Sequence, residues 1–231
     1  MESDFKEINE LNKRFKNSSP ENVLRDCINS LFKEKVAYVC SFGAESAIIL
    51  DIISKIDKTF PVILLNTMFL FNETLEYKNT ILKKLGLTNC VEIFPDSNNL
   101  NKKDRKNNLW ETDPDKCCNL RKVLPLRMAL EKYDAWISGR KSYHKGERTN
   151  LQIFESLNDK IVINPLINFD TKKINKYFED YKLPRHPLYY KNYFSIGCTN
   201  CTIPSNDLEN IRSGRWKNTI KTECGIHYKE N

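Results

Sequence analysis

Short apolar runs alternate with amphipathic segments from Val36 onwards, and this alternation constrains the fold more than any other feature of the sequence. The apolar runs are residues 36–40, 61–65 and 91–94, and the segments between them, residues 44–54 and 72–85, repeat apolar side chains at helical spacing. Strands that alternate with helices are typical of a parallel sheet whose faces are covered by helices. The sequence therefore predicts a fold of the α/β class.

The rest of the chain extends this pattern. It predicts helices at about residues 3–33, 120–133 and 170–181, strands at 135–138 and 161–166, a long polar loop at 96–116 and a basic loop at 139–149. No linker or internal repeat divides the chain. We therefore expect one α/β domain over residues 1–182, and a C-terminal tail, residues 183–231, that is irregular, carries cysteines and packs on the same domain.

The composition limits the setting in which the protein works. Its 231 residues carry 37 basic and 30 acidic side chains, and the net charge of +7 suits a nucleotide, an anionic substrate or RNA without choosing among them. No apolar run reaches the roughly 20 residues that span a bilayer, and the first residues do not resemble a signal peptide. We therefore expect a cytoplasmic protein with no membrane partner, whose cysteines stay reduced and serve as metal ligands or nucleophiles.

The segment SFGAES, residues 41–46, lies between a predicted strand and a predicted helix. In such a turn, backbone N–H groups near Ser41, Gly43 and Ser46 and the start of the helix can face a phosphate, which the helix dipole favours. An ordinary tight turn uses the same small residues, and the segment matches neither a Walker loop nor a GxGxxG motif. A phosphate-binding turn is thus one of two interpretations.

Two cysteine pairs form a more specific pattern. Cys117 and Cys118 are adjacent, whereas two residues separate Cys198 from Cys201. Four thiolates suit either zinc or an iron–sulfur cluster. Zinc ribbons use a second CxxC in place of an adjacent pair, so the adjacent pair favours a larger, multi-metal group. The cysteines assigned to packing are Cys27, Cys40 and Cys90.

Another cysteine, Cys224, lies in the segment ECGIH. Lys221 and His227 are close to it in sequence, and positive neighbours favour the nucleophilic thiolate form. Cys224 is therefore a candidate nucleophile. Basic residues in short loops could converge on a multiply charged anion; they are Lys122, Arg140, Lys141, His144, Lys145, Arg148, Arg212 and Arg215.

Together these segments resemble the assimilatory adenosine phosphosulfate reductases, from about residue 36 to residue 227. The resemblance is carried by SFGAES at 41–46, CCNLRKVLPL at 117–126, LPRHPLYYKNYFSIGCTNCT at 183–202, IRSGRW at 211–216 and KTECGIH at 221–227. It implies an adenine-nucleotide α-hydrolase-like parallel sheet flanked by helices. It also implies that Cys224 is the catalytic nucleophile and that a 4Fe-4S cluster is held by Cys117, Cys118, Cys198 and Cys201.

The resemblance further implies a substrate site in the α/β domain and the tail. Its residues would be Ser41, Gly43, Ser46, Lys122, Arg140, Arg148, Arg212, Arg215 and His227. Two segments depart from the family pattern. Asn66-Thr67-Met68 stands where the family has Asp-Thr-Gly, and residues 141–146, KSYHKG, replace a frequent Arg-Arg-Asp-Gln-Ser-Pro segment. Substrate contacts expected from these two segments are the least transferable.

The implied activity is the thiol-dependent reduction of adenylyl sulfate to sulfite and AMP through an S-sulfocysteine, in sulfate assimilation and cysteine biosynthesis. Thioredoxin or glutaredoxin would be the reductant, and nucleic acid is not an expected partner. The chain could also form a homo-oligomer, and its oligomeric state is left open. The cluster would act electrostatically and structurally, placing Lys122 and tying the tail to the domain. The alternative is a preference for the 3′-phosphorylated substrate, since Lys141 and Lys145 could bind the added phosphate.

Two other functions fit part of the sequence. An ATP pyrophosphatase-type tRNA sulfur transferase has a related nucleotide-binding fold, but such enzymes carry SGGxDS, where this chain has Phe42 and Glu45. A zinc-stabilised basic RNA-binding module would account for the charge and the two cysteine pairs, but it would leave Cys224 without a role.

Overall fold

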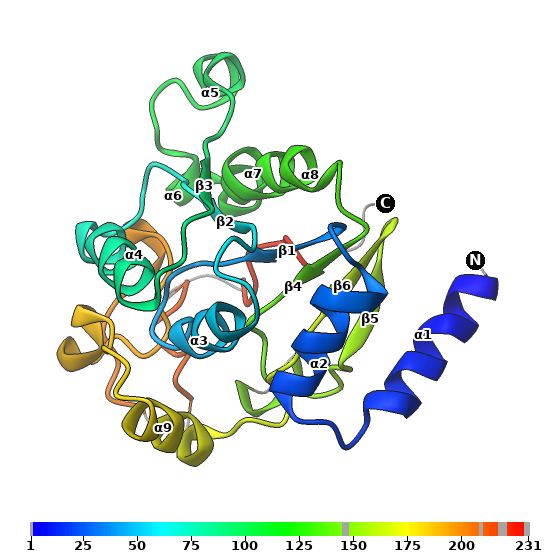
Figure 1. Cartoon of the computed structure of the whole chain (residues 1–231). Helices are drawn as coiled ribbons and strands as arrows, with labels where there is room; N and C mark the ends of the chain where they lie inside the picture. The colour runs from blue at the N-terminus through cyan, green and yellow to red at the C-terminus, as the bar shows by residue number, and fades with distance from the viewer. Residues whose placement is uncertain (1, 145–147, 208–209, 217–220, 229–231) are drawn as a thin grey trace.

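A mostly parallel sheet lies at the centre of the computed structural model, which describes residues 2–144, 148–207, 210–216 and 221–228 (Figure 1). The strands are β1 (Val36–Val39), β2 (Val62–Leu65), β3 (Cys90–Ile93), β4 (Ala135–Ile137), β5 (Phe154–Leu157) and β6 (Lys160–Ile163). Their order is β3-β2-β1-β4-β6-β5, and only the β5–β6 hairpin pair is antiparallel. The predicted α/β class is confirmed.

Helices cover both faces of this sheet because successive strand residues point to opposite faces. Val62 and Leu64 join a large core with α2 (Pro20–Asp26), α3 (Ala47–Ile56), α4 (Asn72–Leu85) and α9 (Thr171–Asp180). Ile63 and Leu65 join a smaller core with α8 (Leu124–Leu130) on the other face. The all-apolar strand β2 is therefore buried on both sides, as expected for the interior of a parallel sheet.

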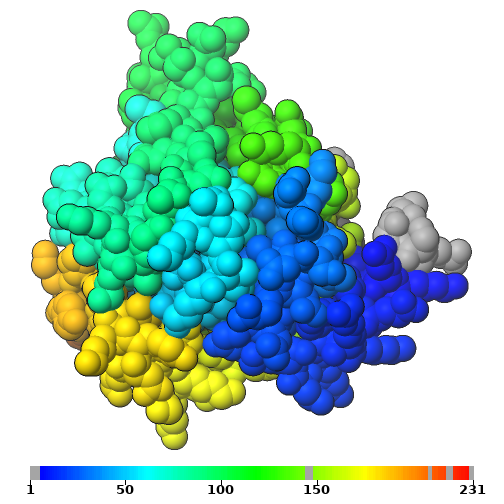
Figure 2. Space-filling model, in the orientation of Figure 1, coloured from blue at the N-terminus to red at the C-terminus, as the bar shows by residue number. Residues whose placement is uncertain are grey.

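The long loop predicted at residues 96–116 is wrong, because three short helices occupy this part of the chain. They are α5 (Ser97–Lys103), α6 (Leu109–Thr112) and α7 (Pro114–Cys118). Asp96 accepts a hydrogen bond from the amide of Asn99, and Asp113 accepts one from the amide of Lys116, so each carboxylate caps a helix N-terminus. Helix α5 projects from the body of the molecule (Figure 2).

A second difference lies at the outer edge of the sheet, where β5 was not expected. The predicted opening helix divides into α1 (Glu2–Phe15), α2 and a π-helical turn, η1 (Cys27–Leu31). Helix α1 lies beside β5 (Figure 1). The Asn12 side chain donates to the carbonyl of Phe154 at 2.8 Å and accepts from its amide at 3.0 Å. This side-chain amide therefore pairs both backbone groups of one residue on an edge strand.

The adjacent cysteines lie on a helical stretch with an irregular centre. A π-helical turn, η2 (Asn119–Val123), joins α7 to α8, so residues 114–130 are helical throughout. Single π-helical turns within α-helices are frequent at functional sites. This stretch carries Cys117 and Cys118 near its beginning and Lys122 one turn later.

The tail is irregular in its described residues, as predicted, and contains the 3-10 turns η5 (Pro187–Lys191) and η6 (Thr199–Cys201). A third 3-10 turn, η3 (Ser142–His144), lies in the basic loop. Backbone bridges pair Leu70 with Cys198 and Thr202 with Arg215, which ties the tail to the loop after β2 and to itself. Among the helices of the described residues, none is long and apolar enough to cross a membrane.

Candidate functional site

A pocket lies at the carboxyl ends of β1, β2 and β4. Strand β1 lies between the other two in the sheet. The chain continues from β1 to β2 and β3 on one side and then returns to β4 on the other side, so the strand order reverses at β1. Ligands of open α/β sheets bind at such a switch point. The C-terminal tail closes the opposite side of the pocket with residues that include Ser195, Gly197 and Cys224.

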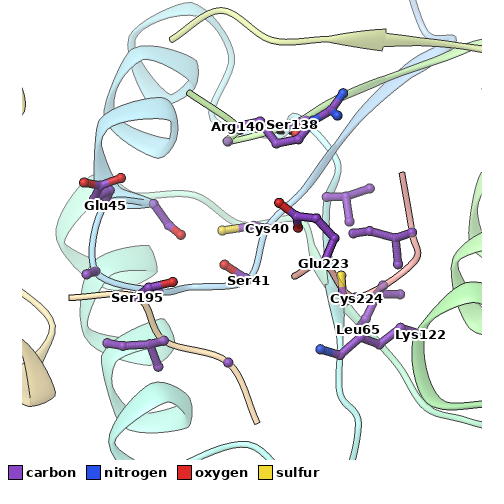
Figure 3. Close-up of a pocket in the computed structure, with 18 of the residues that line it drawn as sticks. Cys40, Ser41, Glu45, Leu65, Lys122, Ser138, Arg140, Ser195, Glu223 and Cys224 are labelled. Atoms are coloured by element: carbon purple, nitrogen blue, oxygen red, sulfur yellow. Dashed lines mark hydrogen bonds between the residues drawn. The ribbon is translucent and has the colours of Figure 1, made fainter. Parts of the chain in front are cut away.

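The turn after β1, residues 41–46, faces this pocket (Figure 3). Phe42 adopts the left-handed region, with φ of 48°, and its ring is fully buried. A Cβ atom built on Gly43 would lie 3.5 Å from the carbonyl oxygen of Ile196, an ordinary van der Waals contact, so the tail packs against this turn without requiring glycine there. The amide of Ser46 donates to the carbonyl of Gly43, and α3 begins only at residue 47. Phosphate binding by this turn stays a prediction.

The four cysteines of the two pairs act on one another electrostatically. Burial, together with the charge of Cys118 and, after it, those of Cys198 and Cys201, raises the pKa of Cys117 to about 12. Burial also raises the pKa of Cys118 to about 11. All the cysteines in the described part of the chain are free thiols. The structure thus brings together four thiols from segments far apart in the sequence.

The loop after β2 contacts the CxxC segment of the tail, which contains Cys198 and Cys201. Thr67 Oγ1 lies 3.2 Å from Cys198 Sγ, and the amide of Thr199 donates to the carbonyl of Phe69 at 2.7 Å. Burial opposes a charge on Cys198, but Lys122, the hydrogen bond with Thr67 and Arg215 together lower its pKa. The segment that departs from the family pattern at residues 66–68 therefore contacts the CxxC loop directly.

Cys224 lines the pocket at the same end as Lys122, and Glu45 lies at the opposite end (Figure 3). We call the part of the pocket formed by Lys122, Cys198 and Cys224 the thiol end. Burial opposes the positive charge of Lys122, but the thiols of Cys198, Cys224 and Cys118 raise its pKa. A cation and a candidate nucleophile thus face the same space, as a reaction between two anions would require.

Carboxylates already partner several cations that were predicted to bind substrate. The ion pairs are Arg140 with Glu155, Arg148 with Glu223 and Lys141 with Glu45. The sequence did not predict these partners. Glu223 and Glu45 gave a signal, because they lie in the motifs ECGIH and SFGAES, whereas Glu155 gave none. Lys145 lies outside the described residues.

Arg212 and Arg215 also reach the pocket from the tail. Arg212 donates to the carbonyl of Thr222 at 2.7 Å, and burial and the charge of Arg148 lower its pKa to about 10. The guanidinium of Arg215 lies over the Trp216 ring at 4.2 Å. The predicted cations therefore do converge on one pocket, although most of them have protein partners there.

His227 stacks on Trp136, with ring centroids 4.9 Å apart and an interplanar angle of 19°. Burial, followed by the charges of Arg140, Arg148 and Arg212, lowers the pKa of His227 well below its usual value. Its buried Nδ1 has no hydrogen-bond partner in the described part of the chain. His227 is therefore a neutral ring beside the pocket and could hydrogen-bond a ligand.

The sheet order and the pocket at the strand ends define an adenine-nucleotide α-hydrolase-like protein. Residues 35–204 match the sequence model of the phosphoadenosine phosphosulfate reductase domain, and the chain belongs to this family.

Relatives of similar length bear one name, "Adenosine 5'-phosphosulfate reductase". The protein from Chelativorans sp. is 40% identical over 219 residues, 94% of this chain and 89% of its own. The protein from Halalkalibacterium halodurans is 39% identical over 226 residues, 95% and 96% of the two chains. A crystal structure of phosphoadenylyl-sulfate reductase from Candida auris, a phosphate complex, superposes with a TM-score of 0.71 and 27% identity, covering 85% of this chain and 96% of the other.

Proposed function

We propose that this chain reduces adenylyl sulfate to sulfite and AMP, with Cys224 as the nucleophile. The observation that carries the proposal is the position of Cys224, which lines the pocket of a nucleotide-binding fold at the same end as Lys122. Relatives about 40% identical over most of the chain are named for this substrate. The oxidoreductase activity belongs to sulfate assimilation.

In the first step, the Cys224 thiolate attacks the sulfur of the phosphosulfate. An S–S bond forms, the bond from sulfur to the phosphate oxygen breaks, and AMP leaves with the electron pair. Two anions approach each other in this step, so cations at the reacting atoms lower the barrier. Lys122 and Arg215 supply that charge at the thiol end, and His227 donates a hydrogen bond from its neutral ring.

In the second step, a dithiol protein such as thioredoxin or glutaredoxin attacks the Cys224 sulfur and releases sulfite. The reductant then closes its own disulfide, so the two electrons of its thiols reduce the sulfate-level sulfur of the substrate, which leaves as sulfite, and Cys224 returns to the thiol state. Because Cys224 lies in the pocket, the tail opens between the two steps. We place this reaction in the cytoplasm and treat residues 183–231 as a tail on the domain formed by residues 1–182.

The four clustered thiols fit an iron–sulfur cluster by their chemistry. In the described part of the chain, no three His, Cys, Asp or Glu side chains are placed to hold one metal ion. The cysteine ligands of a 4Fe-4S cluster bind different iron atoms, which spaces their sulfurs more widely than ligands of one zinc ion. Cys117, Cys118, Cys198 and Cys201 would hold the cluster. When bound, it supplies a fixed charge and a link between α7 and the tail.

Replacing Cys224 tests the nucleophile. Incubation with adenylyl sulfate and no reductant should add one SO3 group to the peptide that contains Cys224. In Cys224→Ser, both this adduct and turnover should be lost, while AMP binding persists because the arginines and Lys122 are unchanged. Peptide mass mapping and a sulfite-release assay make the measurement. Turnover above about a tenth of the parent rate would contradict the assignment.

Metal analysis tests the cluster. Protein purified without air should contain iron and acid-labile sulfide in equal amounts, and Cys198→Ser should lose both. Because Cys198 joins the tail to the loop after β2, the same substitution should make the tail more sensitive to limited proteolysis. Cys90→Ser is the matched control, since Cys90 lies on the edge strand β3 away from the set. Stoichiometric zinc without sulfide would refute the cluster.

We propose adenylyl sulfate rather than its 3′-phosphorylated form as the preferred substrate. Lys141, a candidate ligand of the added phosphate, is almost fully buried, pairs with Glu45 at 2.8 Å and donates to the carbonyl of Gly139 at 2.9 Å. The comparison to make is the ratio of kcat/KM for the two nucleotides with saturating reductant. A ratio above about tenfold in favour of the phosphorylated form would reverse this choice.

A further inference from the structure

Glu223 is a buried carboxylate beside the nucleophile, and neither reduction step uses it. Its side chain is 9% exposed and lines the pocket next to Cys224 (Figure 3). Burial opposes its charge, but hydrogen bonding and charge from Arg148, followed by the charges of Arg212 and Arg215, lower the pKa of Glu223. A buried charge of this kind is stable only while its partners stay in place.

Arg148 offers Glu223 one whole edge of its guanidinium. Nε donates to Oε1 at 2.5 Å, and Nη2 donates to Oε2 at 2.9 Å. Such a bidentate contact fixes orientation as well as distance. Arg212 Nη2 lies 3.3 Å from Oε2 and donates to the carbonyl of Thr222. Two arginines therefore hold the two residues that immediately precede Cys224.

The residue after Cys224 gives the chain a sharp turn. Gly225 has φ of 86°, in the left-handed region that glycine adopts without steric cost. Because the chain changes direction directly after Cys224, the residues before Cys224 determine where its side chain points. Those residues are Thr222 and Glu223, both fixed by arginines of the pocket.

We propose that Glu223, held by Arg148, is the positioning residue that keeps Cys224 at the thiol end of the pocket. Arg148 is then an anchor of the tail and not a contact of the substrate, which changes the role expected from the sequence. This inference rests on the proposed function, in which Cys224 is the nucleophile. Lys122 and Arg215 remain as the cations that face the reacting group.

The first experiment measures tail closure without any nucleotide. Cys224 is alkylated with iodoacetamide, and its modification is followed by peptide mass analysis in the wild type and in Glu223→Gln. Loss of the anchor should accelerate alkylation at least about tenfold, since a buried ion pair is broken. Glu73→Gln is the matched control, because Glu73 pairs with Lys191 of the tail at an exposed position and should leave the rate unchanged.

The second experiment separates positioning from substrate binding. In a single turnover with saturating adenylyl sulfate and no reductant, Glu223→Gln and Arg148→Gln should each slow adduct formation at least about tenfold, and the double variant should be no slower. Glu223→Asp, which keeps the charge, should recover part of the rate. Arg148→Lys keeps the positive charge beside Glu223 but removes the bidentate contact, so it separates the geometry of this ion pair from its charge balance. In a Cys224→Ser background, the Kd of adenylyl sulfate should change less than about threefold in each variant.

Two results would overturn the proposal. Alkylation and adduct rates within about threefold of the wild type in Glu223→Gln would show that Glu223 does not anchor the tail. A tenfold change in Kd in Arg148→Gln would assign the guanidinium to the substrate. If alkylation accelerates as expected while the wild type forms no adduct with adenylyl sulfate, the anchor stands and the proposed function fails.

Discussion

Arg121 is a buried cation that organises both halves of the cysteine set. It is 2% exposed, and its partner Asp104, at 2.8 Å, is fully buried. It also donates to the carbonyl of Thr67, and its guanidinium lies over the Phe69 ring at 4.2 Å. One side chain thus ties the helical stretch of the adjacent cysteines to the loop that holds Cys198.

Removing this cation should destabilise the fold strongly. Arg121→Met leaves Asp104 buried without its ion partner, which costs about 3–5 kcal/mol and lowers Tm by roughly 6 to 20 °C in a chain of this size. Arg14→Met is the control, because Arg14 and Asp26 form an exposed pair worth at most about 1 kcal/mol. Differential scanning calorimetry compares the two. Equal shifts would contradict the argument that burial makes the Arg121 pair critical.

The side chains of the site differ in how far the sequence could predict them. The cysteines and the arginines of IRSGRW are chemically distinctive and stand in compact motifs, so they could be singled out. Glu155 could not, because it lies in no motif, an acidic residue is common in any sequence, and its partner is decided by the fold. Glu155 reaches Arg140 only because β5 forms a hairpin that the sequence analysis missed.

At the scale of elements, the tail begins with a capped turn. His186 is fully buried, and its Nδ1 accepts from the amide of Leu188 at 3.1 Å. Nε2 therefore carries the proton of the neutral ring and donates to Thr74 Oγ1 at 3.0 Å. Burial, partly offset by the charge of Glu73, lowers the pKa of His186 to about 4. The neutral ring thus fastens the first turn of the tail to α4.

Mild acid should weaken this attachment. His186 takes up a proton near pH 6.5 in the unfolded chain and only near pH 4 in the folded chain. The contribution of the neutral His186 ring to the free energy of unfolding is therefore complete above pH 6.5 and is lost as the pH falls toward 4. Between pH 7.5 and pH 5 the wild type should lose about 2 kcal/mol more than His186→Asn, which keeps an acceptor for Leu188. Urea unfolding at both pH values makes the measurement. A constant difference would contradict the assignment.

Elements were predictable where apolar spacing defines them. Helix α4 has the predicted bounds, and Gly86 ends it with φ of 68°. Helices α5 and α7 were missed because single capping side chains, Asp96 and Asp113, define them and their surfaces are mostly polar. Strand β5 was missed because only Phe154 of its residues is buried and its partner strand follows after a tight turn.

At the scale of the whole molecule, the two edges of the sheet differ in how far they are covered. Helix α1 covers β5, and Asn12 satisfies both the amide and the carbonyl of Phe154. At the other edge, near β3, Val91 is 48% exposed and Phe94 is 56% exposed. An edge strand with unpaired backbone groups is a template for another chain, so α1 closes one of the two edges.

Opening the covered edge should promote self-association. Asn12→Ala leaves two backbone groups of Phe154 without partners, at a cost of about 1–3 kcal/mol, and exposes them to a second copy. Light scattering should show a molar mass that rises with concentration relative to the wild type. Asn89→Ala removes only an exposed hydrogen bond to Thr59 and should leave the mass unchanged. An unchanged mass in both variants would show that α1 covers the edge without Asn12.

Paired and unpaired cations lie in different parts of the pocket. Lys141, Arg140 and Arg148 are each neutralised by a glutamate. Lys122 and Arg215 form no ion pair with a carboxylate of the described residues, and both lie near Cys198. The pocket cations that pair with no carboxylate of the described residues therefore lie at the thiol end. Cations without a carboxylate partner attract the anionic end of an approaching ligand, so capture should be fast at low salt and should slow as ionic strength rises.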